Sequence, residues 1–494
     1  MKAKLYSMLL VLLATSACTL EEDTSGFSTP GTFYRDKSQC ISGLNSCYIP
    51  LKSLYTYKMM LATESVTDLC YSSSATQDAQ LDISPAKPRF GAEVWTNAYK
   101  GVMYCNTVIA GIERSPLEED VRAPLLAEGK VLRAFYYWLL TSFFGDVPFY
   151  TVDVSDVEVL TEVGRLPRMS AADTRNALIE ELQACVPCME QIRTSEIADN
   201  RCGAAMGWML IAKMSMWNKR WDTAIGALNE LEAIYGDLEQ YPLSDIPFSR
   251  KNTPESIFEI QHTYTAGGLI YTSNVACICM PRPRAEGTSV YAGVEIPELG
   301  NNATTWVPIV PTTYFYDNLQ PADGTDKRRE MQLSTGWNGK TYDKSKTYFG
   351  PKFWCYGMQT TYDSNNYKVF RYADALLMKA ECLCMQEEDA DAAMEYLNKV
   401  KRRAGIGEYT HFRSWARLMD EIMEERGREL LGEFQRKFDL VRWGNWYERT
   451  TLQTESKAVL ANILPCHEYY PIPDTEVTYS NYALDNDAYA AYGL

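Results

Sequence analysis

The sequence predicts a mainly α-helical protein in which helix hairpins form a scaffold and one long irregular segment is inserted between them. Three observations support this prediction: residues 134–144 are apolar at nearly every position, residues 204–236 and 372–405 have the spacing of tetratricopeptide-like helix hairpins, and residues 241–367 show no helical period. The composition is 46% hydrophobic and 23% charged, which suits a large ordered core and excludes disordered and fibrous classes.

The chain is acidic, with a formal net charge of -16 and a pI near 4.9. Basic residues cluster only at 327–329 and 401–403, in runs too short to outweigh this charge. An acidic surface repels phosphate backbones and anionic lipid surfaces. We therefore expect no nucleic-acid partner.

The first residues have the pattern of an export signal. Lys2 and Lys4 precede an apolar run at 5–14, and small residues then lead to Cys18. The pattern resembles a bacterial lipoprotein signal, in which the cysteine becomes the lipidated first residue of the mature chain. Because Thr15 stands where leucine is usual, an ordinary signal-peptidase site with an incidental Cys18 is the alternative.

The expected organisation is a signal peptide at 1–17, a lipidated tether at 18–35 and a single domain at 36–494. Residues 19–23 make the tether acidic, which looks like the surface-export signal of Bacteroidetes lipoproteins. The mature protein would then be attached to the membrane by its lipid and would not span it.

Within the domain, residues 36–64 carry apolar side chains at three- and four-residue steps, which predicts a helix. Residues 67–90 are polar, contain Ser and Pro and show no period, so we expect a long loop. The helical period returns at 92–113 and at 170–189, where Ser170 can cap the first turn.

The central element lies between these last two helices. Charged residues stop at Arg133, and from 134 to 144 no face is left for water, which is typical of a buried helix. A membrane span needs about 20 such residues, and Gly145 and Pro148 end this run too early. We expect its aromatic side chains to pack in the core.

Further helices are predicted at 414–431 and 435–443, after the second hairpin. Residues 469–473 contain two prolines and must be extended, and the polar tail from Asp474 is expected to cover the surface. The two hairpins are too far apart in sequence for a continuous solenoid.

The inserted segment is the predicted binding region. Residues 241–367 are dense in Pro, Gly, Asn, Asp and Thr and carry scattered Tyr and Trp side chains. A long segment without a regular core pattern is typical of a functional surface built from loops, and we expect short β-hairpins there.

Cysteine and histidine positions do not indicate a metal site. Removing Cys18 from the 14 cysteines leaves 13, so at least one thiol cannot pair within the chain, and the oxidation state of the others is open. The close pairs at 185/188, 277/279 and 382/384 have no neighbouring histidine, whereas a zinc site needs four ligands. We expect no cofactor and assign no metal ligand.

Four motifs stand in order along the chain: EGKVLRAFYY at 128–137 with FGDVP at 144–148, RYADALLMKAE at 371–381, EERGRELLGE at 424–433 running on to 443, and PIP at 471–473. Together with the lipoprotein-like start, they resemble the SusD/RagB family, the surface glycan-binding lipoproteins that partner a TonB-dependent transporter in Bacteroidetes. This sequence departs from the family pattern at Phe434, where the family commonly has glycine. The difference affects only the local turn expected at that position.

The resemblance implies a SusD-like fold, with a helical-repeat scaffold at about 36–240 and 368–494 and the ligand-binding region at about 241–367. It also implies that the protein captures an oligo- or polysaccharide at the outer-membrane surface and delivers it to a SusC-like TonB-dependent transporter for nutrient uptake. The implied protein is not an enzyme. Its partners would be the glycan and the transporter, and it would contact the membrane only through the lipid anchor.

Sugar binding requires flat aromatic rings against the apolar faces of the sugars and polar side chains for the hydroxyl groups. The insertion and the loop after Ser65 supply both, although most of the 33 Tyr and 11 Trp must serve packing. The candidate platform residues are Trp306, Trp337, Tyr291 and Tyr271, and the candidate polar residues are Asp68, Tyr71 and Gln77.

Other functions stay open at this point. The family also includes peptide binders, so a peptide ligand is the nearest alternative, and a broad polar cavity would favour it. A surface glycoside hydrolase would need two carboxylates about 5 to 10 Å apart across a cleft. A scaffold lipoprotein would bind only a protein partner.

Glu425 and Glu429 share one helix face and could be mistaken for a catalytic pair. Arginines stand around them at 426, 428, 436 and 442. We therefore expect charge-assisted pairing between helices and not catalysis.

Overall fold

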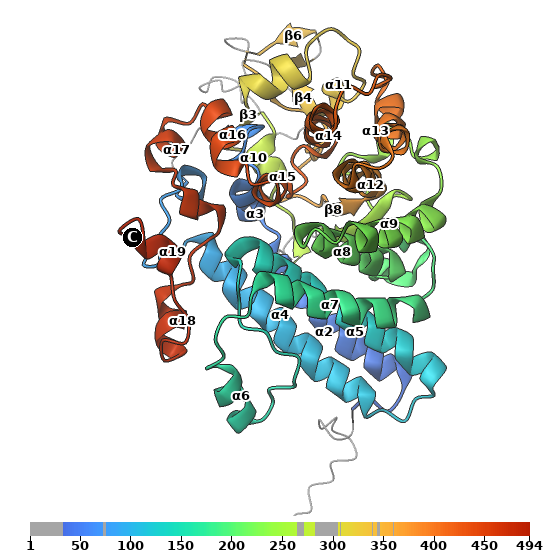
Figure 1. Ribbon diagram of the computed structural model, residues 1–494, viewed down its shortest axis with the longest axis vertical. Helices are drawn as coiled ribbons and strands as arrows, with labels where there is room; N and C mark the ends of the chain where they lie inside the picture. Colours follow the sequence, from blue (N-terminus) through green and yellow to red (C-terminus); the bar gives the residue numbers. More distant parts are fainter. Residues whose placement is uncertain are drawn as a thin grey trace, which may run out of the picture.

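The computed structural model describes residues 33–72, 76–263, 271–281, 305–306, 308–337, 339–342, 346–358 and 360–494. The predicted site residues Cys18 and Tyr291 lie outside these ranges. Helices dominate the described chain and strands form short pairs (Figure 1). None of the described helices combines the length and the apolar character needed to cross a bilayer.

Four long helices pack together at one end of the molecule (Figure 1): α2 (Lys37–Leu54), α4 (Phe90–Glu113), α5 (Glu119–Phe144) and α7 (Ala171–Cys185). The helices predicted at 92–113 and 170–189 are confirmed. The Ser170 hydroxyl accepts a hydrogen bond from the Asp173 backbone N–H at 3.0 Å, as its predicted role as a cap requires.

The single helix predicted at 36–64 is wrong, because the chain breaks into two helices. α2 ends at Leu54, Tyr55 leaves helical geometry, and α3 (Tyr57–Thr63) begins after Thr56. The Thr56 hydroxyl accepts a hydrogen bond from the Lys58 N–H at 3.3 Å, so a side-chain cap competes with continuation of the helix. The break brings Tyr57 against Trp306.

α5 is the central helix, as predicted. Every side chain from Val131 to Phe144 is buried, and the helix ends at Gly145, whose φ of 71° suits glycine. α4 approaches α5 so closely that a Cβ placed on Gly101 would lie 2.3 Å from the Tyr136 ring.

Both predicted helix hairpins are confirmed: α8 (Ala204–Trp217) with α9 (Trp221–Tyr235), and α12 (Tyr372–Gln386) with α13 (Ala390–Ala404). The hairpins pack on each other through α9 and α12, where the rings of Tyr235 and Tyr372 stack 5.1 Å apart. Lys379 Nζ also pairs with Glu232 at 2.6 Å. Hairpins distant in sequence therefore form one block (Figure 1).

The strands form four antiparallel pairs within the described residues: β1 (Cys70–Ser72) with β3 (Ile309–Pro311), β2 (Ser256–Ile260) with β8 (Tyr367–Arg371), β4 (Leu333–Ser334) with β7 (Tyr348–Phe349), and β5 (Gly336–Trp337) with β6 (Lys340–Thr341). β1 lies in the segment predicted as a loop. All residues of β2 and β8 are buried, so this pair closes the inserted segment at its base inside the core.

The C-terminal part continues with α14 (Trp415–Leu430), α15 (Arg436–Arg442), α16 (Trp446–Gln453) and α17 (Lys457–Asn462). The extended stretch at 469–473 is confirmed: the Tyr470 N–H donates to the Phe143 carbonyl at the end of α5 over 2.6 Å. The tail then packs two short helices on the surface, α18 (Asp474–Tyr479) and α19 (Asp487–Ala490).

Short elements complete the described chain: α6 (Val157–Val163), α10 (Ala276–Cys279), α11 (Arg329–Gln332) and a π-helical segment at Tyr314–Leu319. α10 matters most for the site, because it contacts β3 and supports two aromatic clusters.

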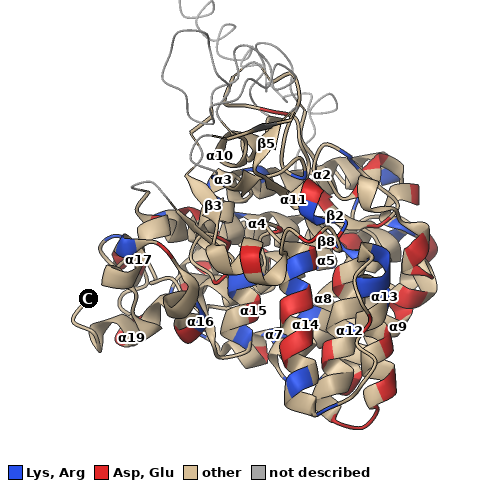
Figure 2. Cartoon of the chain, turned by 90° about the horizontal axis from the view of Figure 1, so that it is seen from above, with Lys and Arg blue, Asp and Glu red and all other residues tan. Residues whose placement is uncertain are grey.

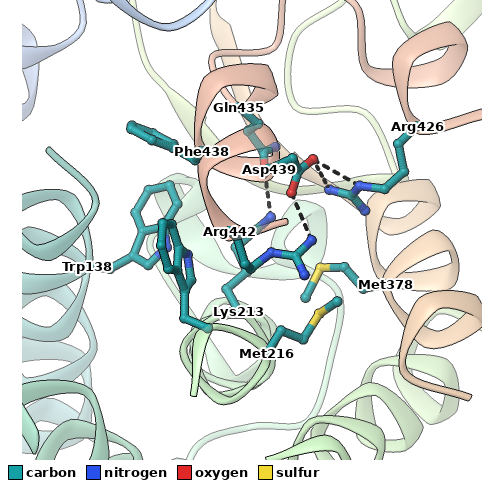
Figure 3. Close-up of a pocket in the computed structure, with 10 residues that line it drawn as sticks. Trp138, Lys213, Met216, Met378, Arg426, Gln435, Phe438, Asp439 and Arg442 are labelled. Atoms are coloured by element: carbon teal, nitrogen blue, oxygen red, sulfur yellow. Dashed lines mark hydrogen bonds and ion pairs between the residues drawn. The ribbon is translucent and has the colours of Figure 1, made fainter. Parts of the chain in front are cut away.

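Buried ion pairs join the helices at their centre. Arg426 binds Asp439 at 2.7 Å and Asp374 at 2.9 Å, and Lys213 binds the other oxygen of Asp374 at 2.8 Å. Figure 3 shows Asp439 between Arg426 and Arg442. Trp138 and Phe438 lie on the opposite side of the pocket from Arg426 (Figure 3). The space left here is about 20 Å³, which holds about one water molecule and no ligand.

Candidate functional site

Three aromatic side chains form a cluster in the inserted segment, which we call the aromatic platform: Trp337, Trp354 and Tyr356. The rings of Trp337 and Trp354 lie 5.1 Å apart, and the Tyr356 ring lies 6.4 Å from Trp337 and 6.3 Å from Trp354. Trp354 is fully buried, Trp337 is half-buried, and Tyr356 is 46% exposed. Two partly exposed rings therefore rest on a buried one.

The backbone holds the platform in place. Trp337 ends β5, which pairs with β6 in a tight hairpin. The Trp354 indole N–H donates to the Phe349 carbonyl at 2.9 Å, which fixes the buried ring. The Cys355 N–H contacts the Met280 sulfur at 3.4 Å, so the platform is attached to the end of α10.

Trp306 forms a second aromatic contact, with Tyr57. The two half-buried rings meet edge to face with centroids 5.4 Å apart and an interplanar angle of 84°. The Trp306 N–H donates to the Cys277 carbonyl at 3.0 Å, and the Tyr57 N–H donates to Asn274 Oδ1 at 2.9 Å. Trp306 and the platform are thus attached to the same short helix, α10, near opposite ends; Figure 2 shows α10, α3 and β5 at one end of the molecule.

Asp68 cannot serve as a ligand residue, and its prediction is wrong. The carboxylate is fully buried and binds Arg436 through two hydrogen bonds of 2.7 and 2.8 Å and Arg449 at 2.8 Å. Burial alone would raise its pKa, but the two arginines lower the pKa of Asp68 below its usual value. Asp68 therefore joins β1 to α15 and α16.

Tyr71 and Gln77 stay near the surface. Tyr71 is half-buried on β1 opposite Val310. Burial and the neighbouring Glu455 carboxylate raise the pKa of Tyr71 to about 12, so its hydroxyl stays protonated and can donate. Gln77 is exposed and precedes a 3-10 turn at Asp78–Gln80. Both residues stay candidates for contacts with hydroxyl groups.

Tyr271 lies apart from the platform. Its ring is 59% exposed, and the Lys52 ammonium of α2 lies 5.9 Å from the ring centroid. Tyr271 lines a groove beside α2 that contains none of the platform residues. The structure therefore groups Trp337 with Trp354 and Tyr356, pairs Trp306 with Tyr57, and leaves Tyr271 at a different place.

The sequence analysis does not predict Trp354, Tyr356 or Tyr57 as members of the candidate site. The stretch Trp354-Cys355-Tyr356 concentrates aromatic side chains in a segment otherwise poor in apolar periodicity, and that density was an available signal. Tyr57 carried no such signal, because it was assigned to the middle of a helix that in fact breaks just before it.

The suspected carboxylate pair on α14 is structural. Arg328 lies between Glu425 and Glu429, at 2.7 and 2.8 Å, and all three side chains are fully buried. Burial would raise the pKa of Glu429, but Arg403, Arg371 and Arg328 hold it well below its usual range. A general acid needs the opposite shift.

The partners of this pair differ from those expected. Only Arg428 of the four nearby arginines binds Glu425, at 2.8 Å. Arg426, Arg436 and Arg442 bind Asp439, Asp68 and Glu381 instead. The ribbon of α14 carries both acidic and basic residues along its length (Figure 2). In the described part of the chain, no group of three or more His, Cys, Asp or Glu side chains is placed to hold a metal ion.

The fold and the aromatic platform define a helical-repeat scaffold that carries its exposed rings on an irregular insertion. Two family profiles match this chain: the SusD family at residues 312–489, and a family described as starch-binding associating with outer membrane at residues 42–176. SusD-like protein P25 of Formosa agariphila is 24% identical over 95% of each chain. SusD-like protein P2 of the same organism is 23% identical over 89% of this chain and 90% of its own.

Solved structures show the same fold. Surface glycan-binding protein A of Bacteroides uniformis superposes with a TM-score of 0.74 at 22% identity, over 92% of this chain and all of its own. The Bacteroides thetaiotaomicron protein of that name, solved with laminarihexaose, gives 0.71 at 20% identity, over 91% and 99% of the two chains. The two profile matches, the curated relatives and the fold all agree with a SusD/RagB-like protein.

Proposed function

We propose that this protein binds an oligo- or polysaccharide at the cell surface through the aromatic platform. The observation that carries the proposal is the pair of partly exposed rings, Trp337 and Tyr356, held on the buried Trp354. Aromatic rings of fixed orientation stack on the apolar faces of sugar rings at a small entropic cost, since they do not have to be ordered on binding. Trp306 is the next ring available along α10.

Relatives support the choice of ligand class. One similar protein was solved in complex with laminarihexaose, and another is described as a laminarin-binding SusD-like protein, with a TM-score of 0.70 at 20% identity. Laminarihexaose is therefore the first probe. A neutral hexasaccharide panel should accompany it, because ligand identity follows the loop residues and not the fold.

The proposal extends to the place and partner of binding. Lipid attached to Cys18 would hold the protein at the outer-membrane surface, and a SusC-like TonB-dependent transporter would receive the glycan. Binding occurs without chemical turnover, which agrees with the buried, paired state of Glu425 and Glu429. Co-purification of the transporter from detergent extracts tests the partnership, and its consistent absence would contradict it.

The binding test uses the full chain with Cys18→Ser, which prevents lipidation. Calorimetric titration should show binding of at least one neutral hexasaccharide, and Trp337→Ala and Tyr356→Ala should each weaken it by about five- to tenfold, as expected for a lost stacking contact of about 1 kcal/mol. Tyr479→Ala is the matched control, because Tyr479 is 79% exposed on α18, away from the platform.

Two outcomes would contradict this proposal. The first is equal affinity of the wild-type, Trp337→Ala and Tyr356→Ala proteins for the bound saccharide. The second is release of shorter sugars from the hexasaccharide by the purified protein, which would favour a glycoside hydrolase. Binding of a peptide digest with no binding of any saccharide would instead favour a peptide-uptake protein.

A further inference from the structure

A groove of about 610 Å³ opens beside α2, and we call it the Tyr271 groove. The C-terminal half of α2 forms one wall, the end of β2 forms another, and the turn at residues 199–201 closes one side. The volume falls within the range of about 300 to 1,000 Å³ that is typical of small-molecule sites. The side chains that matter for recognition are Asn45, Lys52, Asp199 and Tyr271.

The walls of the groove are fixed by contacts behind them. Arg201 binds Glu128 at 2.6 Å and lies over the Tyr48 ring, 5.4 Å from its centroid. On the other wall, the Gln261 amide donates to Asn252 at 2.7 Å and accepts from Asn366 at 2.9 Å. Pre-organised walls of this kind reduce the entropy lost when a ligand binds.

The charges in the groove balance. Arg201 is neutralised by Glu128, and Glu259 is neutralised by Lys368 at 3.0 Å. Lys52 and Asp199, which carry opposite signs, also line the groove, and the Lys52 ammonium lies 5.9 Å from the centroid of the Tyr271 ring. The groove therefore has no net charge with which to select an anionic or cationic ligand.

The remaining groups match an uncharged, hydroxyl-rich ligand with an apolar face. The Asn45 carbonyl accepts from Arg201, and the Gln261 amide is held by Asn252 and Asn366, which leaves the Asn45 NH2 group to donate and the Asp199 carboxylate to accept. Tyr271 offers a ring that is 59% exposed beside these polar groups. The ring, the Asn45 donor and the Asp199 acceptor together are the chemistry that a neutral sugar requires.

We propose that the Tyr271 groove is a second saccharide-binding site, separate from the aromatic platform. The proposal rests on the proposed function in its ligand class, but it concerns different residues. A polysaccharide long enough to reach both sites binds more tightly than a hexasaccharide, because the second contact then forms within one complex.

The test measures saccharide binding in four forms of the full Cys18→Ser chain: wild type, Trp337→Ala, Tyr271→Ala and the double variant. Calorimetric titration with laminarihexaose, and in parallel with cellohexaose and maltohexaose, should show residual binding in Trp337→Ala. Adding Tyr271→Ala to Trp337→Ala should lower the number of saccharides bound per chain by one, whereas adding Tyr479→Ala should leave that number unchanged. Because the ligand is neutral, raising the salt concentration tenfold should change the residual affinity by less than about twofold.

Tyr271→Ala should fold normally because the side chain is mostly exposed, and an unchanged melting temperature checks this. The proposal is overturned if Trp337→Ala alone abolishes all saccharide binding, or if the double variant binds as many saccharides per chain as Trp337→Ala does. In both of these cases the proposed function stands. If no saccharide binds the wild-type protein, the proposed function and the second site both fail. A peptide digest that binds the wild-type protein but not Tyr271→Ala would show that the groove binds peptides instead.

Discussion

The guanidinium of Arg328 donates to the Glu425 carboxylate across 2.7 Å and so joins positions 97 residues apart. Arg328 belongs to the inserted segment and Glu425 to α14 of the scaffold. Both side chains are fully buried, and Arg328 also binds Asp326 and Glu429. The insertion is therefore fixed to the helices by a buried charge cluster as well as by the β2–β8 pair.

Replacing this arginine should be strongly destabilising. Arg328→Met leaves Asp326, Glu425 and Glu429 short of a counter-charge, and removing one partner of a buried pair costs about 3 to 5 kcal/mol. The control is Arg402→Met, because Arg402 pairs with Glu408 on the surface and should cost less than about 1 kcal/mol. Urea unfolding midpoints compare the two; equal midpoints would show that the buried cluster does not stabilise the fold.

Phe434 has a φ of 64°, a left-handed conformation that explains why glycine is usual at this turn. Its buried ring packs against Tyr55 and Tyr367, with centroids 5.5 and 5.3 Å away. Phe434→Gly should relieve about 1 kcal/mol of strain but lose about 3 to 5 kcal/mol of packing, for a net destabilisation of about 2 to 4 kcal/mol.

The matched control for strain alone is Asn481→Gly. Asn481 has a φ of 56° and is exposed, so the substitution removes strain without removing packing. Its unfolding free energy should rise slightly or stay within about 0.5 kcal/mol of the wild type. A stabilising Phe434→Gly would mean that strain outweighs the ring contacts.

Two helical glycines should respond in opposite directions to alanine. Gly101→Ala places a methyl group about 2.3 Å from the Tyr136 ring, where α4 meets α5, and should cost about 1 to 3 kcal/mol or more through overpacking. Gly226→Ala lies in α9 with nothing within 4 Å of the new atom and should stabilise the protein by up to about 1 kcal/mol. Thermal unfolding of both variants measures this; destabilisation by both would contradict the close approach as the cause.

Lys437 gives the fold a pH dependence. Burial lowers the pKa of Lys437 to about 7, and its ammonium lies between the rings of Trp446 and Tyr470. An unfolded lysine has a pKa near 10.4, so between about pH 7 and pH 10 the unfolded state holds more protons than the folded state. Stability therefore rises with pH through this window, and the cost of burying the charge is fully present below it.

Lys437→Met should remove this dependence. At pH 6 to 7 the variant should be more stable than the wild type, by about 4 to 5 kcal/mol at most, and the difference should shrink as the pH rises toward 10. Lys457→Met is the control, because Lys457 is exposed on α17. A constant difference between variant and wild type from pH 6 to pH 10 would show that Lys437 does not titrate in this window.

The helical scaffold could be predicted because its signals are local. Periodicity located α4, α7 and both hairpins, and the apolar run located α5. The break between α2 and α3 was missed because it depends on one hydroxyl cap at Thr56, which periodicity does not register. The same limit applies to β1, a strand of three residues whose partner lies more than 200 residues downstream.

The site was predicted less well because its residues meet through distant contacts. Trp337 was named from its position in an aromatic-rich segment, but its neighbours Trp354 and Tyr356 come from beyond the β5–β6 hairpin. Asp68 was misassigned because its partner Arg436 lies 368 residues away, so its burial leaves no local trace in the sequence. Tyr291 stays a prediction outside the described residues.

The end of α5 is completed by residues from the far end of the chain. Phe143 accepts the Tyr470 N–H and packs on Phe438, and Trp138 packs on Phe438 as well. Because synthesis delivers the N-terminal residues first, Trp138 and Phe143 lack these partners until the last 60 or so residues arrive. A nascent chain that stalls before residue 438 would leave these two apolar rings without the partners that cover them in the finished protein.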